Sequence, residues 1–66
     1  MAHKQLSQHD EALLKQIRQI DDEWGWARWP EISHLAQQLE DEETKQMWNR
    51  TCIHYNHLEE ASIGEL

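Results

Sequence analysis

The 66-residue chain contains a single cysteine, Cys52, so no internal disulfide forms and a cysteine-rich secreted scaffold is excluded. It has only two glycines and one proline, and no glycine-rich loop of the kind that cradles phosphates. No apolar run approaches the roughly 20 residues of a membrane-spanning helix, and residues 1–5 lack the apolar core of a signal peptide. These absences predict an intracellular protein, cytoplasmic or nuclear.

Acidic residues are missing from one segment of an otherwise acidic chain. The formal net charge is −7, from 13 Asp and Glu against six Lys and Arg, yet residues 44–58 contain no acid at all. Residues 21–43 hold eight of the acids and only one base, Arg28. Uniform acidity would favour solubility and nothing more specific. The segregation of charge predicts two surfaces with different roles.

The length of the chain sets a further limit. Residues 1–66 form one small domain, which buries only about 60% of the surface that its unfolded chain exposes. Such a domain has little room for an enclosed substrate pocket. Four tryptophans are an efficient means of building a small core, and the apolar spacing assigns Trp24 and Trp29 to that core.

Apolar residues recur at helical spacing along the whole chain, and no segment alternates with the period of a strand. Ser7 and Asp10 have the form of a capping box that opens a first helix. Gly25 and Pro30 mark a break, and Pro30 suits the first turn of a second helix. The pattern therefore predicts an all-α fold, a small three-helix bundle of homeodomain-like type. The predicted helices span residues 7–23, 30–39 and 42–60, between short flexible ends at 1–5 and 61–66.

The third predicted helix has two faces of different character, given a rotation of about 100° per residue. Asparagine and β-branched residues are poor helix formers at exposed sites, so their presence on the outward face suggests selection for contact with a partner. An arbitrary polar face is the alternative. The inward face consists of Met47, Trp48, Thr51, Cys52, Tyr55 and Leu58. The outward face consists of Gln46, Asn49, Arg50, Ile53, Asn56 and His57.

Two acidic clusters have different explanations. Residues 40–43 lie at the start of the third helix, where acids interact favourably with the positive end of the helix dipole. Asp21, Asp22 and Glu23 lie at the end of the first helix, where the dipole disfavours them. Either the first helix ends near Ile20, or these three acids serve an outward surface.

Three segments of the chain follow a family pattern: Leu6-Ser7-Gln8-His9-Asp10-Glu11, Trp29-Pro30-Glu31-Ile32-Ser33 and Lys45-Gln46-Met47-Trp48-Asn49-Arg50. Together they resemble a divergent, acidic Myb/SANT-like domain, a homeodomain-like tri-helical fold, over residues 6–58. Leu6 and Thr51 stand at the first and last aromatic positions of that family, and the connection from Asp21 to Trp29 is longer and more acidic than is usual there. The resemblance implies DNA binding where basic residues surround the third helix. For acidic SANT-type members it implies protein binding, including binding to histone tails.

Charge favours a protein partner over DNA. Nucleic-acid affinity comes mostly from phosphate neutralisation by Lys and Arg, and this chain has six such residues against 13 acids. The sequence therefore predicts a non-enzymatic regulatory or adaptor module that binds another protein, with a basic target as one option. One alternative is a DNA-binding protein of Myb or homeodomain-like type that reads DNA with its third helix, a role in transcription regulation. A further alternative is an acidic inhibitor that mimics nucleic acid. A homodimer is a further alternative.

Trp26 has no obvious inward position, so it either folds back over the core or is exposed beside the acids that precede it. Tryptophan and arginine are enriched among the residues that dominate binding energy at interfaces. The predicted partner-binding residues are Gln46, Asn49, Arg50, Ile53, Asn56, His57, Trp26, Asp21, Asp22 and Glu23.

Catalytic and metal chemistry finds little support in the sequence. His54 and His57 have the i, i+3 spacing of a ligand pair, but no second pair accompanies them and Cys52 is predicted to point inward. A small buried thiol is the simpler interpretation of Cys52. We therefore predict no catalytic residue, no metal and no cofactor.

Overall fold

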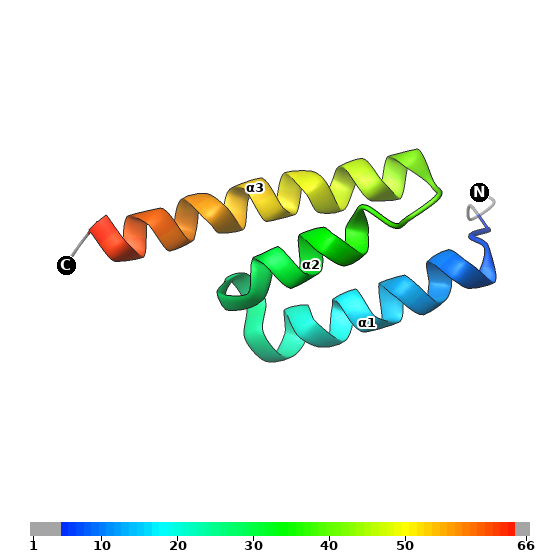
Figure 1. The fold of residues 1–66 in the computed structure, drawn as a ribbon, viewed down its shortest axis with the longest axis horizontal. Coiled ribbons are helices and arrows are strands. Elements are labelled where there is room, and N and C mark those ends of the chain that lie inside the picture. The colour runs from blue at the N-terminus through cyan, green and yellow to red at the C-terminus, as the bar shows by residue number, and fades with distance from the viewer. Residues whose placement is uncertain (1–4, 65–66) are drawn as a thin grey trace.

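The structure is a computed structural model that describes residues 5–64, and all of its regular elements in that range are helical. The elements are α1 (Gln8–Trp24), the 3₁₀ turn η1 (Gly25–Arg28), α2 (Trp29–Ala36) and α3 (Glu42–Gly64), as Figure 1 shows. The expected all-α class is confirmed. Among the described residues, none of the helices combines the length and the hydrophobicity that spanning a membrane requires.

The first two predicted helices are not separated by a non-helical connection, contrary to expectation. Residues 8–36 form one bent helical run through η1, so the described part of the chain has two continuous helical runs rather than three separate helices. Gly25 makes the bend with a φ of 55°, a conformation that glycine adopts without strain, and its N–H donates to the carbonyl of Asp21. Pro30 then lies in the first turn of α2, where no amide donor is needed.

The helix boundaries differ from the expected ones chiefly at their carboxyl ends. α2 ends at Ala36 because the chain turns there, with the N–H groups of Gln38 and Leu39 donating to carbonyls three residues back. That turn delivers Leu39 into the core. α3 continues to Gly64, so the expected helix end at residue 60 is wrong. Of the expected flexible ends, residues 1–4 and 65–66 lie outside the described residues.

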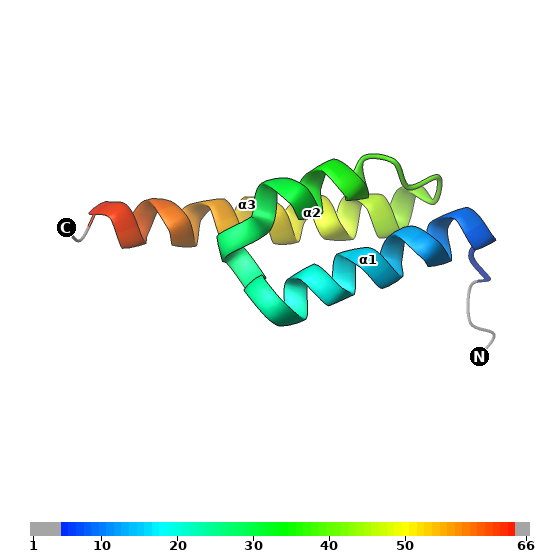
Figure 2. The same cartoon turned by 60° about the horizontal axis from the view of Figure 1, so that its bottom comes forward.

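α1 and α3 run in the same direction and α2 runs in the opposite one (Figures 1 and 2). α2 packs against both neighbours, whereas the Cα atoms of α1 and α3 come within 8 Å of one another nowhere in the described chain. Side chains therefore bridge that junction. The hydroxyl of Tyr55 donates to the carboxylate of Asp21 at 2.6 Å, which joins the end of α1 to the middle of α3.

The core lies where α1, α2 and α3 meet, and it is smaller than the apolar pattern predicts. α2 has eight residues and α3 has 23, so α2 covers only part of the length of α3. Three residues expected in the core are instead exposed at the surface: Trp24, Met47 and Leu58. The buried apolar residues are Leu13, Leu14, Ile17, Ile32, Ala36, Leu39, Trp48 and Cys52, with Trp29, Leu35 and Tyr55 packed against them.

Asp10 connects the start of α1 to the chain between α2 and α3. The side chain of Ser7 accepts the N–H of Asp10 at 3.2 Å, which is the expected N-cap contact. The carboxylate of Asp10 does not serve the local cap. It is 1% exposed and accepts the backbone N–H groups of Glu40 and Asp41, both at 2.9 Å. The bond from the Glu40 amide is the main reason that the pKa of Asp10 is lowered from its ordinary value.

Candidate protein-binding surface

Four of the predicted contact residues form a continuous exposed stripe along α3. Gln46, Arg50, Ile53 and His57 are all exposed, at the helical spacing i, i+4, i+7, i+11. We call these four residues the outer face of α3. Ile53 is 60% exposed, more than any other large hydrophobic residue described, and it lies at the centre of the stripe. No ion pair within the described part of the chain engages the guanidinium of Arg50.

The two predicted asparagines lie in a groove rather than on the outer face. Asn49 and Asn56 are half-buried and line an open groove between α2 and α3, which we call the α2–α3 groove. Ser33 and Gln37 line it from α2, and Ile53 forms its outer edge. The side-chain amide of each asparagine offers two N–H donors and one acceptor oxygen. The groove therefore places directional polar groups directly beside an exposed apolar side chain.

The predicted acidic cluster divides between two roles. α1 continues to Trp24, so the first helix does not end near Ile20. Asp21 is half-buried and accepts the Tyr55 hydroxyl, so it is engaged inside the molecule. This bond, together with burial and the negative charge of Asp21, raises the pKa of Tyr55 to about 12. Asp22 and Glu23 are exposed.

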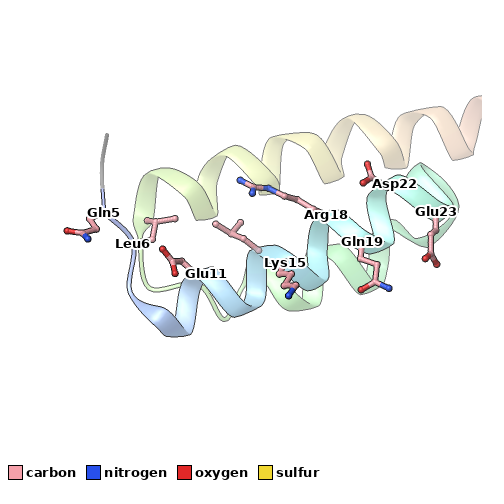
Figure 3. Close-up of a pocket in the computed structure, with 9 residues that line it drawn as sticks. Gln5, Leu6, Glu11, Lys15, Arg18, Gln19, Asp22 and Glu23 are labelled. Carbon is pink, nitrogen blue, oxygen red and sulfur yellow. The ribbon is translucent and has the colours of Figure 1, made fainter. Parts of the chain in front are cut away.

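Asp22 and Glu23 line a second open groove, which runs along α1. Figure 3 shows Arg18 and Asp22 on the side of α1 toward α3, and Lys15 and Glu23 on the other side. The groove has a volume of about 970 Å³, but its walls come from α1 and from Gln5 and Leu6 in the segment that precedes it. It is therefore a surface groove of mixed charge, and it lacks the enclosure of a substrate pocket.

The bend between α1 and α2 displays aromatic side chains. Trp26 is 39% exposed and Trp24 is 50% exposed. The guanidinium of Arg28 lies 4.3 Å from the centre of the Trp24 ring, and its Nη1 is 3.3 Å from a carboxylate oxygen of Glu31. Of the two alternatives for Trp26, the structure therefore shows the exposed one. Trp29, by contrast, packs at the edge of the core and donates its indole N–H to Glu59.

One cluster of potential metal ligands was not visible in the sequence. His9 Nδ1 lies 3.1 Å from carboxylate oxygens of both Asp10 and Glu40. Both oxygens of Asp10 already accept backbone N–H groups, so its carboxylate has a structural role in closing the fold. Thirty positions separate Asp10 from Glu40, which is why local sequence patterns give no signal for this contact.

Cys52 is buried, with its sulfur 3.8 Å from the carbonyl oxygen of Trp29. Burial is the main cause of the raised pKa of its thiol, and the charge of Asp21 adds to it. A thiol in this state is a poor nucleophile.

The chain matches no protein-family model, no curated protein and no solved structure.

Proposed function

We propose that this chain is a non-enzymatic regulatory or adaptor module that binds another protein through the outer face of α3 and the α2–α3 groove. The observation that carries the proposal is Ile53, 60% exposed at the centre of a stripe without acids and bordering a groove that contains two asparagines. The Trp-containing surface around Trp26, Asp22 and Glu23 is the second contact region of the proposal.

The chemistry of this region resembles that of a protein interface more than that of a solvated helix. An apolar centre with polar groups around it and few charges is the usual anatomy of such interfaces. Fully burying an exposed isoleucine side chain is worth about 1.5–3 kcal/mol. A partner that covers Ile53 gains the part of this that belongs to its exposed 60%. Asn49 and Asn56 add hydrogen bonds that would fix the orientation of the partner.

The area that a stable protein–protein interface must bury determines how much of the surface of this chain takes part in binding. A stable interface buries about 800 Å² on each partner, and the whole chain exposes 5217 Å². The interface would thus use about 15% of the surface. A single stripe of four side chains does not supply that area, so we propose that the α2–α3 groove is covered together with the outer face of α3.

A matched pair of triple variants tests the proposal. The first variant combines Asn49→Ala, Arg50→Ala and Ile53→Ala. It should keep nearly the same helix content and melting temperature, but it should no longer capture the partner that the natural chain recovers in affinity capture. Lys15→Ala, Gln16→Ala and Gln19→Ala change a base and two amides on exposed positions of α1, and this control should retain the partner. Capture that survives the α3 triple variant would contradict the proposal, and so would unfolding of that variant.

DNA binding is the alternative that the same face allows, and the homeodomain-like arrangement and the Myb/SANT resemblance belong to it. Asparagine, glutamine and arginine make bidentate contacts to base edges, and α3 carries all three. The outer face has Arg50 as its only base, however, and phosphate contacts need several. Titration with random-sequence duplex at low and moderate salt distinguishes the two functions. Salt-sensitive binding that Arg50→Ala abolishes would favour DNA, and no binding at low salt would exclude it.

A further inference from the structure

Trp24 and Trp26 are exposed at the η1 bend, and Leu58 is exposed on the C-terminal half of α3; we call these three apolar side chains the aromatic corner. Their exposed fractions are 50%, 39% and 39%. Clustered exposed apolar area marks interaction sites more often than scattered single residues do.

α1 and α3 run in the same direction, so the end of α1 and the C-terminal half of α3 lie toward the same end of the structure (Figure 1). The bond between Tyr55 and Asp21 fixes the register of the two helices. Trp24 lies three residues beyond Asp21, and Leu58 lies three residues beyond Tyr55, so both are one turn further toward the same end. Trp26 follows in η1, which packs against α3.

The corner already holds one cation of its own. Arg28 stacks over the ring of Trp24 at 4.3 Å and pairs with Glu31 at 3.3 Å. An aromatic face combined with a nearby carboxylate is an arrangement that favours guanidinium groups. Among the described residues, no cation lies over Trp26.

Charge around the corner selects the kind of occupant. Asp22 and Glu23 precede Trp24 as exposed acids, and Glu60 follows Leu58 as another. Arg28 is the only base between residues 19 and 44, and it is already paired. Exposed aromatic rings with a rim of acidic side chains around them are complementary to a peptide segment that carries cationic side chains.

We propose that the aromatic corner docks an arginine-containing basic segment of a partner protein, with an arginine side chain stacked on Trp26 and neighbouring cations facing the acidic rim. This inference rests on the proposed function, since it names the partner class of the Trp-containing surface. The stack of Arg28 on Trp24 is the intramolecular counterpart of the contact.

A peptide titration followed by the indole N–H resonances of the four tryptophans tests the proposal. The probes are acetylated, amidated hexa-arginine and hexa-lysine. Hexa-arginine should shift the signals of Trp26 and Trp24 and leave that of buried Trp48 unchanged. It should bind more tightly than hexa-lysine, because guanidinium stacks on aromatic rings better than ammonium does. Equal binding of the two peptides, or no shift at Trp26, would overturn the proposal.

Three variants sharpen the result. Trp26→Leu should weaken hexa-arginine binding roughly 2- to 30-fold, the range of one cation–π contact, and Trp26→Tyr should restore part of the loss. Arg28→Ala frees the ring of Trp24 and should strengthen binding. Unchanged affinity in Trp26→Leu would show attraction by charge alone and would sink the proposal.

The experiments distinguish failure of the aromatic-corner proposal from failure of the proposed function. The α3 triple variant leaves the corner intact, so it should bind hexa-arginine like the natural chain. If hexa-arginine does not bind while the triple variant still loses its partner, only the corner assignment is wrong. If hexa-arginine binds as predicted while the triple variant keeps its partner, the α3 assignment is wrong.

Discussion

Asp10 joins two parts of the chain that lie 30 residues apart, because both of its oxygens accept backbone N–H groups of the connection between α2 and α3. The sequence indicated only its local role, as the acid of a capping box with Ser7. The contact with Ser7 through the Asp10 amide is present, but the carboxylate serves a distant turn. Local patterns predict local bonds, and a buried acid that satisfies a remote turn leaves no periodic signal.

Asp10→Ala should destabilise the fold because two buried backbone donors lose their acceptor. We expect a fall in melting temperature of more than about 5 °C for a domain of this size. Asp22→Ala removes an exposed acid at the end of α1 and should change the melting temperature little. A melting temperature equal to that of the natural chain in Asp10→Ala would show that the two N–H groups find other acceptors.

The pH dependence of that loss follows from the lowered pKa of Asp10. Folding favours the ionised carboxylate, so its contribution is complete above the ordinary pKa of 3.8 and disappears as the pH falls through the lower folded-state pKa. The stability difference between the natural chain and Asp10→Ala should therefore shrink below about pH 4. Urea unfolding at pH 7, 4 and 2.5 measures it, and a difference independent of pH would contradict this role for the carboxylate.

Tyr55 offers a second residue-scale prediction, at alkaline pH. Its pKa is raised to about 12, so folding favours the protonated phenol. The contribution of the bond to Asp21 is complete below the ordinary pKa of 10.0 and is lost as the pH rises toward 12. Tyr55→Phe should cost about 0.5–1.5 kcal/mol at neutral pH and nothing near pH 12. As the chain has only one tyrosine, absorbance at 295 nm reports its ionisation directly.

At the scale of the helices, some sequence patterns were sufficient to predict the structure and others were not. Helical periodicity predicted an all-α chain, and projection of the third helix placed Gln46, Arg50, Ile53 and His57 outward, as observed. The continuity of residues 8–36 could not be predicted, because glycine and proline mark a helix end and a tight bend equally well. The α2–α3 groove was also out of reach, since it depends on how α2 lies against α3.

Gly25 carries the bend between α1 and α2, with φ 55° and ψ −132°. A Cβ at this position would meet no atom within 4 Å, so any cost of a side chain comes from backbone strain alone. Gly25→Ala should therefore destabilise the fold by about 1–3 kcal/mol, measured by urea unfolding. A synthetic chain with D-alanine at position 25 is the matched control, because a D-residue favours positive φ and should be neutral or stabilising. Equal effects of both alanines would contradict this account.

At the scale of the whole molecule, the charge segregation has two explanations. Within residues 21–43, Asp21 and Asp41 form internal contacts, whereas Asp22 and Glu23 face solvent. The acid-free segment contains the buried Trp48 and Cys52 as well as the outer face of α3. Folding thus explains part of the charge pattern, and the two proposed binding surfaces account for Asp22, Glu23 and the acid-free outer face of α3.

Cys52 reports on the opening of the whole domain, since it is the only thiol and lies in the core. Cys52 borders the α2–α3 groove but is only 3% exposed. A thiol reagent therefore reaches it mainly when the helices separate, because burial both shields the sulfur and raises the pKa of the thiol. Labelling in native buffer should be slow, and should accelerate with denaturant in parallel with the loss of helical signal.

Ile17→Val, at a fully buried position, should lower the free energy of unfolding by about 0.5–1.5 kcal/mol. That cost corresponds to labelling roughly 2- to 12-fold faster. Ile53→Val makes the same chemical change on the exposed outer face of α3 and should leave the rate unchanged. Equal acceleration in the two variants would mean that Ile53 stabilises the fold. Its exposure would then no longer support the outer face of α3 as a binding surface.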